Sequence, residues 1–562
     1  MKLSIEGIKD KKEWEKAGIK LPSYDVEKVA TATKEAPVWV HFGIGNIFRI
    51  FIGGIADSLL EQGLSDKGIT CVETFDYDVV DKIYTPFDNL VMAVTLKEDG
   101  STDKKVLGSL TEAVKAQSAV EEDWSRLKTI FASPKLQMVS FTITEKGYAL
   151  HDAKGDFFPF IKSDIDNGPD KASSAMAVVA ALLLERFNTC KAPLAVVSMD
   201  NCSHNGEKLR NSVTEMVSEW AKKGFVGEDF VKYVNDENTI SFPWSMIDKI
   251  TPRPADSVAK ALEDAGVEDM APVITSKRTY IAPFVNAEGP QYLVIEDRFP
   301  NGRPQLEKAG VYMTDRDTVN KVERMKVTTC LNPLHTALAV YGCVLGYDLI
   351  ADEMKDKELS ELVRRIGLVE GMPVVTNPGI IDPVKFADEV INVRIPNPFM
   401  PDTPQRIATD TSQKVGIRYG ETIKAYVAKD GSAKSLTAIP LAIAGWCRYL
   451  LGVDDDGAAF ELSPDPMADE LKDQIKGIIW GEPSSYTGQL KNLLSNVNIF
   501  GINLYEAGIG DKVEEIFVEE ISGKGAVRET LKKSLPKLHS FHHRQSKAFS
   551  LTRKQECLTV PI

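Results

Sequence analysis

Hydrophobic runs alternate with amphipathic stretches through the first half of the chain. The β-branched run at residues 38–42 leads into Gly43-Ile-Gly45 and a helical pattern that continues to residue 60. A second apolar run at 68–73 follows at the distance expected of a βαβ unit. This alternation indicates a mostly parallel sheet with helices on both faces. Further strands are predicted at 90–95, 128–132, 136–144 and 194–198, and a helix at 172–186.

The hydrophobic period changes to 3.6 residues after about residue 310, which indicates helices. We therefore predict an α/β fold in which a Rossmann-type N-terminal domain is followed by a mostly α-helical C-terminal domain. The predicted helices lie at 333–346, 352–366, 383–391, 437–451, 467–479 and 513–523. The predicted parts are an N-terminal extension (1–35), the Rossmann-type domain (36–310), the helical substrate and catalytic domain (311–540) and a polar tail (541–562).

Composition narrows the class of protein. The 562 residues are 43% hydrophobic and 26% charged, which is typical of a globular protein. Lys and Arg number 67 against 81 Asp and Glu, and the net charge of −14 argues against nucleic-acid or anionic-membrane partners. The seven cysteines are scattered, and the pair His542-His543 has no ligand geometry. We expect a cytoplasmic enzyme with no secretory signal, no membrane span and no metal site.

A nucleotide-binding turn is the first chemical signal. Gly43-Ile-Gly45 lies between a predicted strand and a predicted helix, where a dinucleotide-binding fingerprint places a tight turn and an approach to the pyrophosphate. Phe48 replaces the third glycine, so an ordinary glycine turn remains an alternative. Glu73 ends the second strand, where a carboxylate can bind the adenosine ribose and would repel a 2′-phosphate. If Glu73 is not simply solvated, NAD is favoured over NADP.

Polar residues follow two of the later segments. Asn201 comes directly after the predicted strand 194–198, at the sheet edge where α/β proteins bind ligands. Asn201 therefore holds a substrate oxygen or forms part of a turn, and Asn205-Gly206 is expected to be a turn. Asp248 lies in a Pro-rich, aromatic loop of the kind that often borders a site.

The densest polar segment runs from Glu323 to His335. Pro333 suits the first position of a helix, which makes Asn332 the expected N-cap and puts His335 in the first turn. Capping and partial burial would explain these residues fully. Alternatively, Lys326 is desolvated beside this helix start, has a lowered pKa and acts as general base.

Cations occur near the predicted site as well. Arg406 and Lys414 stand among small polar residues, and Arg253 follows the Asp248 loop. They form either an ordinary surface patch or a set of cations that binds a polyhydroxy acid.

Taken in order, these segments resemble the long-chain polyol and hexuronate dehydrogenases, the mannitol dehydrogenase family. The resemblance covers about residues 36–450, and its ordered set of motifs is specific although each motif alone is weak. One departure is that five residues separate Lys326 from Asn332, one more than in family members, and Asn332-Pro333 replaces Asn-Gly. The matching motifs lie at 41–49, 142–148, 198–206, 242–248, 295–304, 323–335 and 406–414.

The resemblance implies an NAD-dependent enzyme without a catalytic metal. It implies Lys326 as the catalytic base with Glu323 beside it, and Asp248 as an active-site aspartate. Asn201 and Asn332 would hold the reacting oxygen, and His335, Arg406 and Lys414 would contact substrate, with Arg253 a further cation for a carboxylate. The cofactor-binding residues would be Gly43, Ile44, Gly45, Asn46, Ile47, Phe48, Arg49 and Glu73.

The predicted reaction is reversible reduction of a keto-hexuronate to an aldonate, with fructuronate to D-mannonate first. Oxidation of a secondary alcohol requires that its proton be removed while hydride leaves for nicotinamide, and a neutral lysine with two amides suits that chemistry. The alternatives are a mannitol 2-dehydrogenase acting on fructose, a tagaturonate reductase, a sugar-acid epimerase with retained NAD, and a non-catalytic dinucleotide sensor. The expected partner is a small sugar acid or polyol, and the expected state is a monomer or small homo-oligomer.

Overall fold

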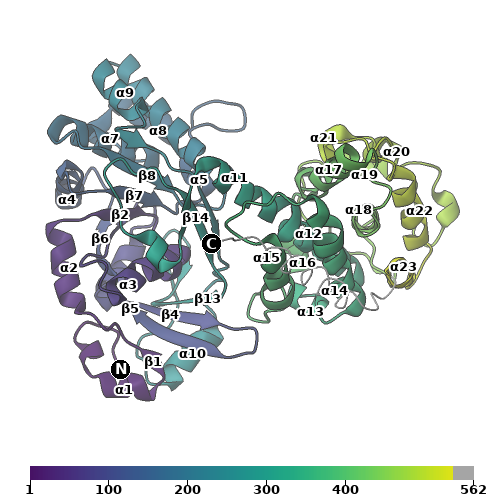
Figure 1. Ribbon diagram of the computed structural model, residues 1–562, viewed down its shortest axis with the longest axis horizontal. Helices are drawn as coiled ribbons and strands as arrows, with labels where there is room; N and C mark the ends of the chain where they lie inside the picture. Colours follow the sequence, from purple (N-terminus) through teal and green to yellow (C-terminus); the bar gives the residue numbers. More distant parts are fainter. Residues whose placement is uncertain (536–562) are drawn as a thin grey trace, which may run out of the picture. The chain divides into compact units, whose positions relative to one another are not determined.

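A six-stranded parallel sheet forms the centre of the N-terminal part of the chain in the computed structural model, which describes residues 1–535 (Figure 1). Its strand order β6-β3-β2-β7-β8-β9 is that of a Rossmann fold, so the predicted fold class is confirmed. Because β2 lies between β3 and β7, the carboxyl ends of these strands meet at the turn that follows β2. The strands are β2 (Trp39–Phe42), β3 (Ile69–Glu73), β6 (Leu110–Lys115), β7 (Met138–Phe141), β8 (Leu194–Ser198) and β9 (Ile240–Ser241).

Helices cover both faces of this sheet and bury its apolar side chains (Figure 1). One core includes Trp124, Leu127 and Phe131 of α4, and the other includes Ile55 and Leu59 of α3. Burial on both faces explains why the strands read as continuous apolar runs. The helices of this part are α1 (Lys11–Lys16), α2 (Val26–Glu35), α3 (Gly53–Glu61), α4 (Glu121–Ala132), α5 (Thr144–Tyr148), α6 (Pro159–Asn167), α7 (Ala175–Thr189), α8 (Asn205–Lys222), α9 (Glu228–Asn235), α10 (Asp256–Asp264), α11 (Arg316–Met325) and α15 (Pro383–Glu389).

Two local predictions were wrong. Residues 128–132 are the end of helix α4, because the buried Trp124, Leu127 and Phe131 recur at helical spacing. Asn205 and Gly206 begin helix α8 instead of forming a turn. The Asn205 Nδ2 donates to the Asp200 carbonyl (3.0 Å) and to the Ser245 Oγ (2.9 Å), which ties the helix start to the end of β8.

Smaller sheets carry the remaining strands. The predicted strand at 90–95 is β4, but it belongs to a mixed sheet of order β1-β5-β4-β13 and not to the Rossmann sheet. A further sheet, β10-β14-β15, presents Asp248 at the end of its strand β10. The strands of these sheets are β1 (Ile19–Lys20), β4 (Val91–Leu96), β5 (Thr102–Leu107), β13 (Phe284–Glu288), β10 (Ser245–Asp248), β14 (Tyr292–Glu296) and β15 (Tyr312–Thr314), and β11 (Val273–Ile274) pairs with β12 (Tyr280–Ile281).

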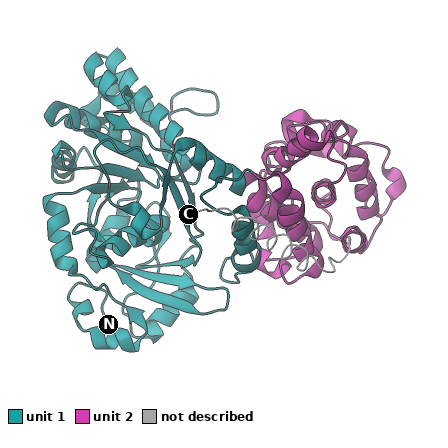
Figure 2. Cartoon of the chain, viewed as in Figure 1, with its two compact units in different colours: residues 1–326, 376–401 teal, residues 327–375, 402–562 magenta. Residues whose placement is uncertain are grey.

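The chain divides into two units whose bounds differ from the predicted domains (Figure 2). Unit 1 contains residues 1–326 and 376–401, and unit 2 contains 327–375 and the chain from Asp402 onward. The extension 1–35 thus packs within unit 1, and so does the predicted C-terminal helix at 383–391. Residues 376–401 belong to unit 1 because they contact it directly. The Asn397 Nδ2 donates to the Leu96 carbonyl (3.2 Å), and Met400 joins an apolar core with β4. The predicted tail, with His542-His543, lies outside the described residues.

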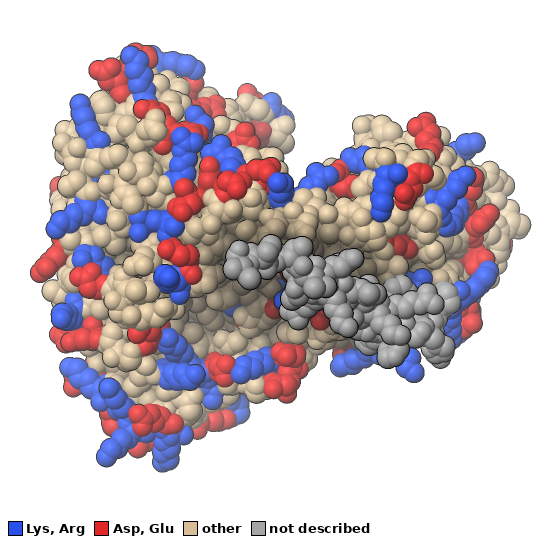
Figure 3. Space-filling model, viewed as in Figure 1, with Lys and Arg blue, Asp and Glu red and all other residues tan. Residues whose placement is uncertain are grey.

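Unit 2 is a helical assembly around the apolar helices α12 and α18, as the 3.6-residue period predicts. Over the face shown in Figure 3, basic and acidic side chains are interspersed. Among residues 1–535, no helix is both long enough and apolar enough to cross a membrane. The helices of this unit are α12 (Asn332–Leu345), α13 (Ile350–Glu353), α14 (Lys357–Arg364), α16 (Pro404–Ile407), α17 (Glu421–Asp430), α18 (Ala438–Tyr449), α19 (Ala468–Gln474), α20 (Lys491–Leu494), α21 (Val497–Phe500), α22 (Gly510–Glu520) and α23 (Ala526–Ser534).

A carboxyl group with a raised pKa lies in the core of unit 2. Glu520 is fully buried, and burial raises its pKa to about 8. The Tyr341 hydroxyl lies 2.7 Å from both the Leu441 carbonyl and the Glu520 Oε1. A hydroxyl has one hydrogen, so both contacts are satisfied when tyrosine donates to the carbonyl and the carboxyl group donates to tyrosine.

Glu520 is therefore expected to make unit 2 less stable as pH rises. With this raised pKa the folded chain keeps the proton up to about pH 8, whereas an unfolded glutamate loses it near its ordinary pKa of 4.5. Between these values the free energy of unfolding falls by about 1.4 kcal/mol per pH unit. Glu520→Gln should flatten the decline of Tm between about pH 5 and pH 8. Glu515→Gln, which changes an exposed acid on the same helix, should not, and equal slopes in all three proteins would contradict the prediction.

Candidate active site

The predicted nucleotide turn is built around Gly43. Its φ of +86° lies in the left-handed region, and an added Cβ would come 2.2 Å from the Thr142 carbonyl oxygen, so only glycine fits. Gly45 is different, because a Cβ there would meet nothing within 4 Å. The helical segment begins directly afterwards at Asn46 and continues through a π-helical turn (Phe48–Ile52) into α3. The open backbone at Gly45, just before a helix N-terminus, fits a pyrophosphate.

Glu73 lies beside this turn at the end of β3. Its Oε1 accepts bonds from the N–H groups of Thr74 (3.0 Å), Phe75 (2.9 Å) and Asp76 (3.2 Å). Its Oε2 lies 3.5 Å from the Ile44 nitrogen, at the edge of the glycine turn. Burial raises the pKa of the carboxyl group, and the backbone donors oppose that effect. The structure thus places Glu73 where the ribose role requires it, and that role stays a prediction.

Two residues of the turn have their side chains directed into the protein. Phe48 is buried and stacks on His41 with ring centroids 4.0 Å apart. The buried Arg49 guanidinium donates to the Asn46 Oδ1 and the Ala282 carbonyl, both at 2.7 Å. With no carboxylate among its described partners, burial lowers the pKa of Arg49 to about 10. Phe48 and Arg49 therefore support the turn, while Gly45, Asn46 and Ile47 are exposed or half-buried.

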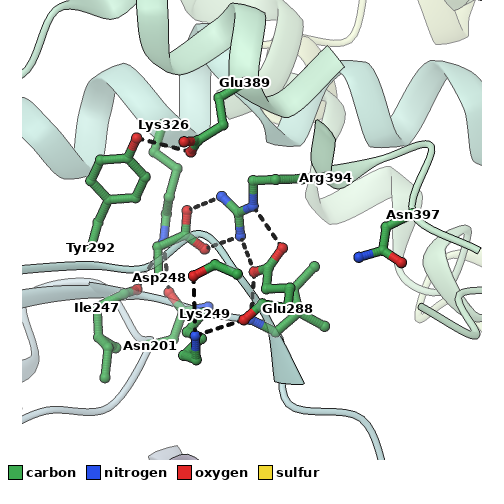
Figure 4. A network of polar contacts seen from close by, with 12 residues as sticks. Asn201, Ile247, Asp248, Lys249, Glu288, Tyr292, Lys326, Glu389, Arg394 and Asn397 are labelled. Atoms are coloured by element: carbon green, nitrogen blue, oxygen red, sulfur yellow. Dashed lines mark hydrogen bonds and ion pairs between the residues drawn. The ribbon is translucent and has the colours of Figure 1, made fainter. Parts of the chain in front are cut away.

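Unit 1 brings three of the predicted catalytic residues together (Figure 4). Lys326 follows the last residue of α11, and its Nζ donates to the Asn201 Oδ1 at 2.9 Å and to the Ile247 carbonyl at 3.3 Å. Asp248, the next residue on β10, lies beside the same amine. Since Lys326 occupies the Asn201 Oδ1, the Nδ2 of Asn201 is left to donate to an incoming oxygen.

The surroundings of Lys326 favour its neutral form. Its side chain is buried, and burial lowers the pKa of the amine. The charges of Asp248 and the half-buried Glu323 oppose this effect, whereas the positive charge of Arg394 adds to it. A lysine with a lowered pKa gives up its proton more readily than a solvated lysine, as general acid–base catalysis requires.

A buried ion cluster beside Lys326 was missed in the sequence. The Arg394 guanidinium contacts the Asp248 carboxylate twice, at 2.6 and 3.0 Å, and the Glu288 carboxylate twice, at 2.8 and 3.0 Å. All three side chains are buried. Glu288, the charged last residue of the buried strand β13, was the available signal, because a buried charge requires a partner.

The three predicted cations belong to both units, with Arg253 in unit 1 and Arg406 and Lys414 in unit 2. Arg253 is exposed, with its guanidinium 5.5 Å from the Tyr280 ring centroid. In unit 2, Arg406 is paired with Asp402, and the Lys414 Nζ donates to a backbone carbonyl. Burial and the charge of Arg418 lower the pKa of Lys414. The substrate contacts of these cations stay predictions.

The start of α12 differs from the prediction. Asn332 is the first residue of the helix, not its N-cap, and Leu331 precedes it. The Asn332 Oδ1 is buried and has no hydrogen-bond partner among the described residues, and His335 lies in the first turn. The extra residue between Lys326 and Asn332 is accommodated by a π-helical turn, Lys326–Cys330. A π-turn takes up one residue more than an α-helical turn, so the insertion need not change where either end lies.

Comparison with known proteins extends this description. Residues 37–308 match the mannitol dehydrogenase Rossmann domain, and 318–517 match the mannitol dehydrogenase C-terminal domain. The D-mannonate oxidoreductase of Thermotoga maritima is 54% identical over 534 residues, which are 94% of this chain and 98% of that protein. The polyol:NADP oxidoreductase of Gluconobacter oxydans is 29% identical over 80% of this chain and 86% of its own length.

Two solved structures of dehydrogenases have a similar fold. A substrate-free D-sorbitol dehydrogenase has a TM-score of 0.75 at 25% identity and covers 92% of this chain and 98% of its own. The Pseudomonas fluorescens mannitol 2-dehydrogenase, in a ternary complex with NAD and D-mannitol, has a TM-score of 0.66 at 25% identity. The match covers 95% of this chain and 99% of that protein.

The Rossmann sheet, the glycine turn and the buried lysine define an NAD-dependent oxidoreductase that acts on CH–OH groups. The chain belongs to the mannitol dehydrogenase family, with both of its domains matched. The predicted family, enzyme class and cofactor are confirmed.

Proposed function

We propose that this enzyme reduces a keto-hexuronate to an aldonate, with fructuronate and D-mannonate as the reversible pair. The observation that carries the proposal is the contact of the buried Lys326 Nζ with Asn201, in a chain 54% identical to a D-mannonate oxidoreductase over 94% of its length. The relatives named for neutral polyols are 28–30% identical, which favours the sugar acid.

The residues of unit 1 supply the proton chemistry. The backbone of the Gly43–Gly45 turn and Glu73 would hold the cofactor, which would supply hydride as NADH or accept it as NAD. In reduction, the Lys326 ammonium gives its proton to the carbonyl oxygen as that oxygen becomes a hydroxyl group, and in oxidation the neutral amine takes the proton back. The Asn201 Nδ2 donates to the same oxygen and stabilises its developing negative charge.

The substrate contacts assigned to unit 2 are part of the proposal. Asn332 would bind the reacting oxygen, and His335, Arg406 and Lys414 would bind hydroxyl and carboxylate groups of the substrate. The Asn332 Oδ1 is buried without a partner among the described residues, and a substrate hydroxyl that donates to it would satisfy an acceptor whose burial is otherwise costly. We further propose that the enzyme works in the cytoplasm as a monomer or small homo-oligomer. Free cysteines throughout the described residues support a reducing compartment.

The test is an assay of NADH consumption with a panel of substrates, measured by the absorbance of NADH. Purified enzyme is mixed with NADH and fructuronate, tagaturonate, fructose or fructose phosphates. We expect rapid consumption with fructuronate and a kcat/KM at least about tenfold lower with the others, equivalent to about 1.4 kcal/mol. Preference for tagaturonate would identify the enzyme as a tagaturonate reductase, and preference for fructose would identify it as a mannitol 2-dehydrogenase. Tightly held NAD without turnover would favour the epimerase.

A further inference from the structure

The segment 376–401 brings a charged residue from late in the chain to the Lys326 site. Arg394 follows α15 on a π-helical turn, Val390–Arg394, and its guanidinium is 1% exposed. Figure 4 shows it between the carboxylates of Asp248 and Glu288. Each carboxylate receives two bonds, and paired planar groups of this kind fix orientation as well as charge.

We propose that Arg394 is a positioning residue for proton transfer, which orients Asp248 and balances its charge beside the Lys326 Nζ. This inference rests on the proposed role of Lys326 as the general acid/base. Arg394 need not touch substrate, since it would act through strand β10.

The geometry gives Arg394 two ways to act on Lys326. Asp248 follows Ile247 on β10, and the Ile247 carbonyl accepts a bond from the Lys326 Nζ. Holding the Asp248 carboxylate therefore also holds the carbonyl that orients the amine. In addition, the guanidinium charge offsets the carboxylate that would otherwise keep the amine protonated.

Other charged groups around the amine do not replace this pairing. Glu323 favours the protonated amine, as Asp248 does. Lys249 is directed to the Glu288 carbonyl (2.8 Å), and Glu389 is engaged by the Tyr292 hydroxyl (2.9 Å). Within unit 1, Figure 4 shows these titratable groups around Lys326: Asp248 and Lys249 near the end of β10, Glu288 of β13, Tyr292 of β14, and Glu389 and Arg394 of the segment 376–401. Glu323 of α11 also acts on the amine by its charge.

The test is the pH profile of kcat/KM for alcohol oxidation. In this profile kcat/KM rises with pH as Lys326 loses its proton, and this part of the curve is the rising limb. In Arg394→Gln the cation is lost, so we expect the rising limb to move up by about 1 pH unit. Glu288→Gln removes an anion from the other side of Arg394 and can still accept the Ile250 N–H bond (2.7 Å in the wild type), so its limb should move down. Arg394→Lys keeps the charge without the planar fork, and should leave the limb near wild type while lowering kcat.

Each variant is first checked by circular dichroism, Tm and NADH binding. Opposite shifts in Arg394→Gln and Glu288→Gln would support the proposal, because a purely structural role moves stability and not the limb. A wild-type limb in folded Arg394→Gln and Glu288→Gln would overturn it. If Arg394→Gln does not fold, Glu288→Gln decides the question alone. Any secondary alcohol that the wild type oxidises reports the same limb, so failure of fructuronate as substrate overturns the proposed function without removing this test.

Discussion

Lys326→Ala is expected to lower kcat/KM for the keto-hexuronate by about 10²–10⁴-fold, the usual contribution of a general acid or base. The amine bonded to Asn201 at 2.9 Å is the proton carrier in the proposed reaction, and alanine leaves none in its place. NADH binding should be unchanged, since the Gly43 turn is formed by other elements. The measurement is steady-state NADH oxidation together with NADH binding by fluorescence titration.

The matched control is Lys321→Ala on helix α11, the helix that Lys326 directly follows. Lys321 is exposed and pairs with Asp317, so its loss should leave both kcat/KM and NADH binding near wild type. If Lys326→Ala keeps more than about a tenth of the activity, Lys326 does not contribute at the level of a general acid.

Two glycine substitutions should distinguish an effect on the folding of the turn from an effect on NADH binding. Gly43→Ala places a methyl group 2.2 Å from the Thr142 oxygen at a φ of +86°. We expect a cost of about 1–2 kcal/mol from the left-handed backbone and about 1–3 kcal/mol from the contact, seen as a lower Tm. Because the turn must move, NADH binding should weaken as well.

Gly45→Ala should leave Tm unchanged, since its methyl group meets no protein atom within 4 Å. It should still weaken NADH binding by about tenfold, equivalent to about 1.4 kcal/mol, if the cofactor approaches the backbone there. Full-strength NADH binding by Gly45→Ala would contradict the placement of the pyrophosphate at this turn. The two variants are compared by thermal unfolding and by fluorescence titration.

Local patterns in the sequence predict much of the fold. The Gly43 turn, strands β2, β3 and β8 and helix α12 follow from periodicity and turn chemistry, which depend on residues a few positions apart. The same reasoning failed at residues 128–132, where a short apolar run fits a strand or a helix equally well. It also failed to assign β4 to its sheet, because strand partners are chosen by contacts distant in the chain.

The candidate site was also predicted only in part from the sequence. Residue types and their order in the sequence indicated Lys326, Asn201 and Asp248, and a family resemblance gave them roles. The sequence could not show that Arg394 pairs with Asp248, since 146 positions separate them and no local pattern records such a contact. The lowered pKa of Lys326 likewise depends on burial by several elements.

By itself the sequence determined the Rossmann turn, the change from α/β to helical structure and the family, because each is written in short-range spacing or in an ordered set of motifs. Only the tertiary structure decided that residues 376–401 return to unit 1 and that Glu288, Asp248 and Arg394 form one buried cluster. The physical reason is that a buried charge needs partners, and the partners in this cluster are opposite charges from distant parts of the chain, whose contact is fixed by packing and not by local preference.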